Sequence, residues 1–139
     1  MAERAIPPAY CRQDERGSFV EIVNRGPWEA VITGRMNAGA VMGNHYHKVT
    51  DCFFFVCEGR CRMDVVCVTD GSRSRLDLAA GQGAHLPRNH SHAIRFDVPS
   101  TFILLKSRAH DPDDPDTFAH PVPEEGTAAA CDDAAASIT

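Results

Sequence analysis

The sequence has 139 residues, of which 43% are hydrophobic and 24% charged, and its formal net charge at pH 7 is −5. Length and composition are those of one soluble domain with a single core, and the acidic balance argues against nucleic acid as the main partner. Because no apolar run approaches the roughly 20 residues that span a bilayer, we also expect no membrane partner.

The N-terminal segment and the cysteines bear on the cellular compartment. The opening residues, MAERAIPPAY, lack the apolar stretch of a secretory signal. We therefore predict a cytoplasmic protein in which the six cysteines are reduced thiols. No two cysteines have CxxC spacing, which argues against a zinc ribbon.

Short segments with alternating apolar residues follow, separated by turn signals such as Gly26-Pro27 and TDGS at 69–72. A period of two is typical of strands, and short strands with frequent turns are typical of a sandwich or barrel. Glu58-Gly59 predicts a hairpin between two of these segments. No long segment has a helical period, so we predict an all-β domain. The predicted strands cover residues 18–23, 28–33, 42–47, 52–57, 61–68, 74–78, 84–87, 91–96 and 101–106.

The end of the chain differs in charge from the rest. From His110 onward there are eight Asp or Glu residues and no Lys or Arg, which leaves 14 basic and 11 acidic residues before it. The earlier part is mildly basic and therefore compatible with a phosphate-bearing small molecule. The last residues are acidic, rich in alanine and low in complexity, so we predict a domain over residues 1–122 and a frayed tail over residues 123–139.

Two histidines one residue apart, His45 and His47, lie in the predicted strand 42–47. Alternate side chains of a strand share a face, so both imidazoles point the same way and Tyr46 points the other way. Such a pair can hold a metal, move protons or be ordinary strand residues, and the spacing alone does not choose between these. A third histidine, His92, lies far along the chain in LPRNHSHAIR.

The segments around these histidines resemble the two conserved motifs of the cupin superfamily. GNHYH (43–47), followed by Gly59, is similar to the first motif. GQGAHLPRNHSH (81–92) is similar to the second, with His92 in the place of the third metal-binding histidine. The resemblance extends over roughly residues 13 to 122 and implies a single cupin barrel, a double-stranded β-helix of jelly-roll type.

Within the cupins, three segments resemble enzymes that act on 4-keto-6-deoxy sugar nucleotides. DERGSFVEI (14–22) is similar to the opening of 3,5-epimerases and 3,4-ketoisomerases, and GNHYHK (43–48) to a ketoisomerase segment. DPDDPDTFAHPV (111–122) is similar to the closing segment of a metal-binding epimerase domain from capsular-polysaccharide biosynthesis. The resemblance implies an isomerase or epimerase that transfers a proton next to the ketone of a nucleotide-linked sugar. It also implies a homodimer, because cupin edge strands usually pair between subunits.

The sequence departs from these relatives at three places. Cys52 stands where metal-binding cupins have Glu, and strand alternation turns the adjacent Asp51 to the other face unless a bulge intervenes. Met42 stands where relatives usually carry an Arg that contacts phosphate. The tyrosine acid of the 3,5-epimerases has no counterpart, since the chain contains only Tyr10 and Tyr46.

By the resemblance, His45, His47 and His92 hold a metal, with Cys52 within ligand reach. Three imidazoles suit Zn, Fe, Ni or Cu, and a thiolate would favour Zn or Cu. We therefore expect one divalent transition metal, with zinc as the first choice. The alternative for Cys52 is a buried apolar thiol that does not bind metal.

The catalytic base depends on whether a metal is bound. Without metal, His45 and His47 move the protons themselves, as in the ketoisomerases. With metal, another group must act as base, and we expect His90, with His85 and Lys48 as alternatives. Phosphate is expected to bind to arginine and lysine side chains, and Trp28 either stacks on a base or belongs to the core. The predicted substrate-binding residues are Arg16, Lys48 and Arg88, with Arg95 as a further candidate.

Two other classes of function fit the same motifs. Cupins with three histidines include iron-dependent dioxygenases of small molecules, and a cysteine near the site is consistent with them. A non-catalytic cupin that binds a small molecule is the third class. Iron content and oxygen uptake separate the oxygenase from the isomerase.

Overall fold

The structure is a computed structural model in which residues 4–124 are described. These residues form eleven strands and connecting loops, and none of them is helical. Within the same range no helix is present that could cross a membrane. The five cysteines in this range are all free thiols. The all-β prediction is confirmed.

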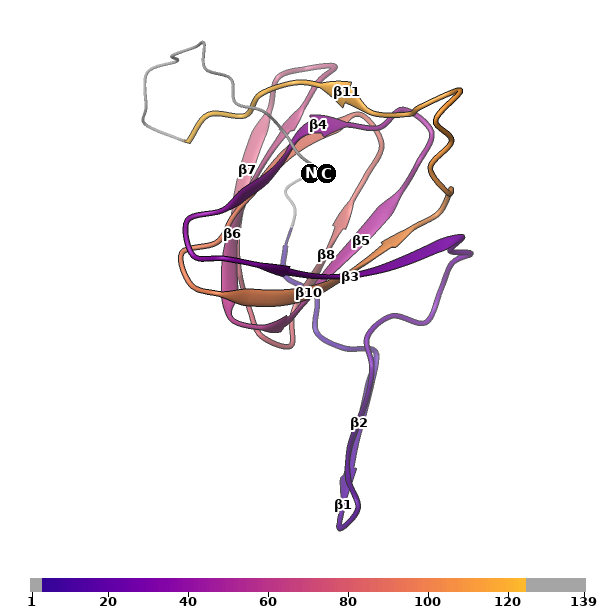
Figure 1. Cartoon of the computed structure of the whole chain (residues 1–139), viewed down its shortest axis with the longest axis vertical. Coiled ribbons are helices and arrows are strands. Elements are labelled where there is room, and N and C mark those ends of the chain that lie inside the picture. Colours follow the sequence, from indigo (N-terminus) through magenta and orange to yellow (C-terminus); the bar gives the residue numbers. More distant parts are fainter. Residues whose placement is uncertain (1–3, 125–139) are drawn as a thin grey trace.

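Two sheets face each other and enclose the core, so that the body has the form of an open barrel (Figure 1). All neighbouring strands in them pair antiparallel. The four-stranded sheet has the order β3 (Ala30–Met36), β10 (Ser100–Lys106), β5 (Cys52–Glu58) and β8 (Gly83–Leu86). The five-stranded sheet has the order β11 (Phe118–Ala119), β4 (Val41–Tyr46), β9 (His90–Arg95), β6 (Arg60–Cys67) and β7 (Arg73–Ala79).

The core between the sheets is built from the inward side chains of both. Phe54, on β5, is fully buried and packs against Phe96 and Phe102, with ring centroids 6.4 and 5.0 Å away. Met63 and Ile94 meet these rings from the five-stranded sheet as part of the same cluster. Burial of each such side chain stabilises the fold by about 1.5–3 kcal/mol. The strand alternation seen in the sequence thus defines which residues face the core.

A separate hairpin of β1 (Tyr10–Asp14) and β2 (Gly17–Glu21) projects from the body (Figure 1). The sequence predicted a strand from residue 18 but not β1, because YCRQD has little apolar alternation. Tyr10 and Phe19 are half exposed on the hairpin and contact each other at a centroid distance of 6.4 Å. The hairpin therefore leaves apolar side chains outside the core.

The predicted hairpin between residues 52–57 and 61–68 is wrong. Strand β5 pairs with β10 and β8, whereas β6 pairs with β7 and β9, so the chain changes sheets at Gly59. A Cβ at Gly59 would overlap Ser100, which shows how closely the corner packs on the start of β10. Strand β5 is apolar on both faces, and between β10 and β8 each face contributes to a core cluster.

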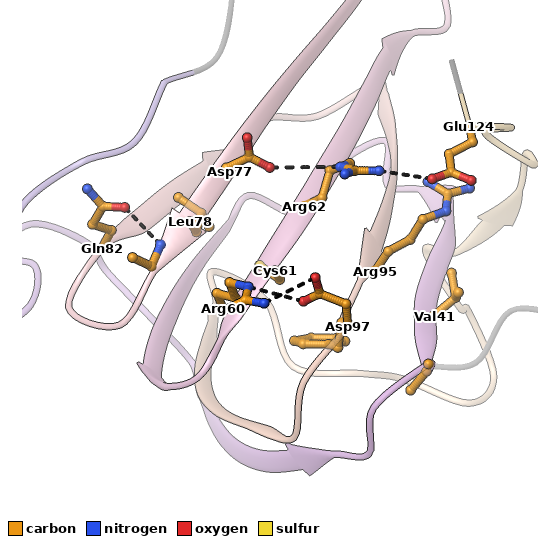
Figure 2. Close-up of a pocket in the computed structure, with 14 residues that line it drawn as sticks. Val41, Arg60, Cys61, Arg62, Asp77, Leu78, Gln82, Arg95, Asp97 and Glu124 are labelled. Atoms are coloured by element: carbon orange, nitrogen blue, oxygen red, sulfur yellow. Dashed lines mark hydrogen bonds and ion pairs between the residues drawn. The ribbon is translucent and has the colours of Figure 1, made fainter. Parts of the chain in front are cut away.

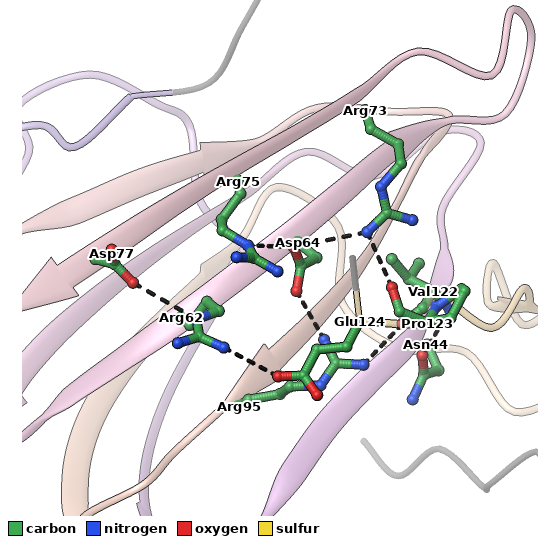
Figure 3. A network of polar contacts seen from close by, with 10 residues as sticks. All are labelled: Asn44, Arg62, Asp64, Arg73, Arg75, Asp77, Arg95, Val122, Pro123 and Glu124. Atoms are coloured by element: carbon green, nitrogen blue, oxygen red, sulfur yellow. Dashed lines mark hydrogen bonds and ion pairs between the residues drawn. The ribbon is translucent and has the colours of Figure 1, made fainter. Parts of the chain in front are cut away.

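The last described segment, residues 116–124, crosses the outer face of the five-stranded sheet, and we call it the C-terminal strap. Beneath it Asp64 is fully buried and accepts hydrogen bonds from Arg75 and Arg95 at 3.0 and 2.9 Å (Figure 3). Arg95 also donates to the carbonyl of Val122 at 2.8 Å, and Val122 is 1% exposed. The strap is thus part of the folded body.

The predicted boundary between domain and tail falls inside this strap. Pro123 accepts a hydrogen bond from Arg73 at 2.9 Å, and Glu124 pairs with Arg62 at 2.9 Å. Packing therefore continues two residues past the predicted boundary at residue 122. The rest of the predicted tail, residues 125–139, lies outside the described residues.

Candidate functional site

Three histidines converge inside the barrel. His45 lies on β4, His47 follows that strand by one residue, and His92 lies on β9 directly opposite His45 in the sheet. Their ring centroids are 4.9 to 6.1 Å apart. One nitrogen of each ring lies within 4.8 Å of the others, and all three residues are buried. Among the described residues this is the group of side chains that could hold a metal ion.

A bulge in β4 brings the two strands together. The pairing of β4 with β9 shifts between Gly43 and His45, and Asn44 at the bulge has a φ of 58°. Gly43 has a φ of 102°, and a Cβ there would lie 2.5 Å from the carbonyl oxygen of His92. Glycine is therefore required for β4 to approach β9 at the site.

The strap holds the bulge from outside. The side-chain oxygen of Asn44 accepts the Val122 amide at 2.8 Å, and its carbonyl accepts the His120 amide at 2.8 Å. On β9, the Ser91 hydroxyl donates to the His120 carbonyl at 2.6 Å. Residues adjacent to His45 and His92 are thus both hydrogen-bonded to the strap.

Asp116, at the start of the strap, orients His47. Its carbonyl accepts a hydrogen bond from Nδ1 of His47 at 2.6 Å, so Nδ1 carries the proton and Nε2 has a free lone pair. Its carboxylate accepts the amides of Lys48 and Val49 at 2.8 and 2.9 Å and the hydroxyl of Thr50 at 2.8 Å. These hydrogen bonds outweigh the effect of burial and lower the pKa of the Asp116 carboxyl. One residue therefore anchors both the imidazole and the loop after it.

The three imidazoles are neutral at pH 7. Burial lowers the pKa of His45 to about 4 and that of His92 to about 3, and the neighbouring imidazoles act in the same direction. Burial also lowers the pKa of His47, against the hydrogen bond to Asp116, which raises it. Nδ1 of His92 is buried without a hydrogen-bond partner within the described part of the chain. Neutral, buried and incompletely bonded imidazoles are the form in which histidine binds transition metals.

Lys106 is a charged residue of this cavity that the sequence analysis missed. It ends β10 and lines the cavity together with the three histidines. Its charge contributes to the lowered pKa values of His45 and His47, after burial. A signal was present in the sequence: Lys106 has the same strand parity as Phe102 and Leu104, which face the core. A lysine on the core face of an apolar strand needs a functional or structural reason.

Cys52 also lines the cavity, which has a volume of about 40 Å³. It is 2% exposed, and burial raises the pKa of its thiol to about 12, so the group is protonated at neutral pH. It does not belong to the group of ligand atoms formed by the three histidines. Asp51 lies on the opposite side of the sheet, where its carboxylate is 3.2 Å from Arg88 and 3.8 Å from His85.

The other predicted site residues do not line the histidine cavity. His90 donates from Nδ1 to the carbonyl of Arg88 at 2.8 Å. Arg16 lies at the turn of the projecting hairpin, where it pairs with Asp14 at 2.7 Å. It does not reach the cavity because that hairpin leads away from the barrel (Figure 1). Lys48 has its ammonium 4.3 Å from the ring centroid of Phe118, on the strap. Strand parity alone does not decide which residues reach the cavity, since His90 shares the parity of His92 on β9 and does not line it.

A cavity of about 710 Å³ lies at another place (Figure 2). Its three arginines are all paired: Arg60 with Asp97 at 3.3 Å, Arg62 with Glu124, and Arg95 with Asp64. No histidine lines it. Arg95, a candidate for binding an anion, is therefore already neutralised on the outer face of the sheet.

The sequence matches the family described as Polysaccharide biosynthesis C-terminal domain over residues 12–118, about three quarters of its length. The chain belongs to this family. The predicted resemblance to the cupin domain of capsular-polysaccharide proteins is thereby confirmed. Among curated proteins no match to the sequence was found.

Comparison with solved structures shows the cupin fold. The capsular polysaccharide assembling protein CapF from Staphylococcus aureus superposes with a TM-score of 0.64 at 24% identity, over 81% of this chain and 34% of CapF. ChmJ, a 3'-monoepimerase from Streptomyces bikiniensis in complex with dTDP-quinovose, gives 0.70 at 19% identity, over 85% of this chain and 69% of ChmJ. A 3,4-ketoisomerase from Helicobacter canadensis gives 0.69 at 15% identity, over 85% and 90%. The chain thus spans about a third of the length of CapF and most of the ketoisomerase.

Proposed function

We propose that this member of the family is an isomerase that moves a proton next to the ketone of a nucleotide-linked 4-keto-6-deoxy sugar. The observation that carries the proposal is the joint placement of neutral imidazoles and the Lys106 ammonium in one buried cavity. The chain also has the fold of a 3'-monoepimerase and a 3,4-ketoisomerase.

The chemistry needs two groups on the protein. A base removes the proton from C3, and the electrons of the C3–H bond form an enolate whose negative charge lies on the C4 oxygen. Delivery of a proton from an acid or a water molecule to the opposite face of C3 inverts that centre. A cation or hydrogen-bond donor beside the C4 oxygen stabilises the enolate, and its effect is strong in a cavity with little water.

His47 and Lys106 are the groups suited to these two tasks. The Asp116 carbonyl holds the proton of His47 on Nδ1, so Nε2 is ready to accept one from carbon. The ammonium of Lys106 can donate to the C4 oxygen. The pKa values of about 4 for His45 and about 3 for His92 make these two imidazoles poor bases at neutral pH. They are better suited to hold the substrate or a metal.

The residues also fit one divalent transition ion, zinc first, with iron, nickel and copper as alternatives. His45, His47 and His92 would hold it, and the carbonyl of Asp116 would act as the outer partner that commonly orients a ligating histidine. Because the Cys52 sulfur does not belong to the group of ligand atoms, the three histidines would leave a coordination position open. A bound ion would polarise the substrate ketone. His47 would then be a ligand, and Lys106, which lines the same cavity, would act as the base in its neutral amine form in place of His90.

The reaction is tested by hydrogen exchange. The protein is incubated in deuterated water with a 4-keto-6-deoxy sugar linked to thymidine or uridine diphosphate, with and without added zinc. We expect deuterium to enter at C3, and at C5 as well if two centres are inverted. No exchange above background with either nucleotide in metal-loaded protein would refute the proposal. Iron in the purified protein together with oxygen uptake would favour a dioxygenase instead.

The predicted homodimer is also a proposal, supported by the projecting hairpin. Tyr10, Phe19 and Val20 are 48–53% exposed on it, and a hairpin of this kind is stable when a second surface covers it. We expect the mass of a dimer by light scattering at micromolar concentration. A monomeric mass would contradict this part of the proposal.

A further inference from the structure

The histidine cavity is too small to hold a whole sugar nucleotide. Its volume is about 40 Å³, whereas pockets for molecules of this size occupy about 300–1,000 Å³. If the proposed function is correct, the nucleotide half of the substrate must bind outside the cavity.

A groove of suitable size lies on the outer face of the four-stranded sheet, whose inner face lines the histidine cavity. It has a volume of about 520 Å³ and is lined by Phe53 of β5, His85 of β8 and Ser107 after β10. Each of these residues is the sequence neighbour of one that lines the histidine cavity, namely Cys52, Leu86 and Lys106. The groove and the cavity are thus back to back at the same end of the barrel.

A third, small space borders both. It has a volume of about 10 Å³ and shares His47, Lys106 and Thr117 with the histidine cavity. It shares Arg108 with the groove. A substrate that crosses this edge of the barrel would therefore pass Arg108 on its way from the groove to the histidines.

The side chains of the groove match a nucleoside diphosphate. Three arginines, Arg25, Arg88 and Arg108, line the groove. Arg88 pairs with Asp51 at 3.2 Å, and Arg108 pairs with Asp114, which lies outside the lining, at 3.5 Å. Arg25 has no ion pair among the described residues, so its guanidinium is available to an anion. Trp28 is partly exposed beside it, with its indole N–H bonded to the Arg25 carbonyl. Arginine forks bind phosphate oxygens in pairs, and an indole face stacks on a nucleobase.

We propose that this groove binds the nucleoside diphosphate of the substrate, with Arg25, Arg88 and Arg108 on the diphosphate and Trp28 on the base. The proposal rests on the proposed function for the identity of the ligand but not for the location of the groove. It assigns phosphate recognition to residues other than Arg16, which the structure places on the projecting hairpin. It also explains how Met42 can stand where relatives carry an arginine.

The experiment titrates the full chain with thymidine diphosphate and with uridine diphosphate and measures the heat of binding by calorimetry. Because Trp28 is the only tryptophan in the sequence, its fluorescence reports directly on the groove. We expect saturable binding with a change in fluorescence. Loss of a hydrogen-bonded charge should weaken binding at least about tenfold in Arg25→Ala and in Arg88→Ala. The matched control is Arg35→Ala, which removes the same charge from an exposed position on β3.

The possible outcomes distinguish failure of the groove proposal from failure of the proposed function. Absence of binding, or equal affinity of Arg25→Ala, Arg88→Ala and Arg35→Ala, overturns the groove proposal. Binding that is weakened by the groove variants, with no hydrogen exchange on either sugar nucleotide, keeps the groove and refutes the proposed function. Exchange whose KM is unaffected by Arg25→Ala and Arg88→Ala keeps the function and overturns the groove.

Discussion

Two buried polar clusters lie on opposite faces of the five-stranded sheet, and they differ in how their polar groups are satisfied. On the outer face Asp64 accepts from Arg75 and Arg95, with Arg73 3.7 Å away, so the buried charge is fully paired (Figure 3). On the inner face His92 has a buried nitrogen with no partner in the described chain, and the imidazoles are neutral.

This difference indicates that the outer cluster stabilises the fold and that the inner cluster is suited to chemistry. A buried charge with several partners is costly to disturb and contributes nothing to a ligand. A buried donor or acceptor without a partner is costly to keep, and such groups are common at functional sites. The strap contacts both clusters, since Asp116 bonds to His47 and Val122 to Arg95. It therefore couples the position of the histidines to the stability of the outer face.

The largest effect is expected from removing an imidazole of the inner cluster, which should slow the reaction. His47→Ala should slow deuterium exchange at C3 by about a hundredfold or more, because a base or a metal ligand is lost. Tyr46→Phe, on the same strand and the opposite face, should change the rate by less than about twofold. The measurement is exchange by proton NMR on protein whose thermal midpoint has been checked. A rate in His47→Ala within threefold of wild type would remove this residue from the mechanism.

Removing the carboxylate of the outer cluster should lower the stability of the protein and leave its activity nearly unchanged. Asp64→Ala leaves three arginines, each between 21 and 34% exposed, without their shared carboxylate. We expect a loss of about 2 kcal/mol in the free energy of unfolding, less than for fully buried partners because solvent reaches these arginines. Urea unfolding measures the loss, and exchange at C3 per folded molecule should stay within about threefold. A loss below 0.5 kcal/mol, on the order of a surface substitution, would contradict the structural role.

Acid should act on the inner cluster of metal-free protein. The pKa values of His45 and His92 are lowered to about 4 and about 3, below the value of 6.5 for the free side chain. The unfolded chain therefore binds protons first, and the stability present above pH 6.5 is lost as the pH falls toward 4. His92→Asn should reduce the slope of the free energy of unfolding against pH by about 1.4 kcal/mol per pH unit between pH 6 and 4. Urea unfolding at several pH values checks it, and an unchanged slope would mean that His92 is accessible to protons in the folded state.

The smallest effect is expected at Cys52. Its sulfur lies outside the group of histidine ligand atoms, so Cys52→Ser should change metal affinity by less than about twofold. Competition with a chromogenic chelator gives the affinity. A decrease of about tenfold or more would show that the thiolate is a ligand and that the site is of the closed type.

Much of the body and part of the site could be predicted from local pattern. Alternation placed His45 and His47 on one face and Tyr46 on the other, and β4 shows that arrangement. The turn signals located most strands to within a few residues. The wrong hairpin at Gly59 shows the limit, because a turn residue marks a change of direction and not the sheet that the next strand joins.

By itself the sequence determined the all-β class, the face of each strand and the shared face of His45 and His47, because these depend on side-chain alternation over a few residues. Only the tertiary structure decided that Lys106 ends beside the histidines, that Asp116 orients His47 from 69 residues away, and that Arg88 faces the outer groove. These contacts join strands from different sheets, or a strand with the strap. They depend on which strands become neighbours when the core closes, and no local period in the sequence records that choice.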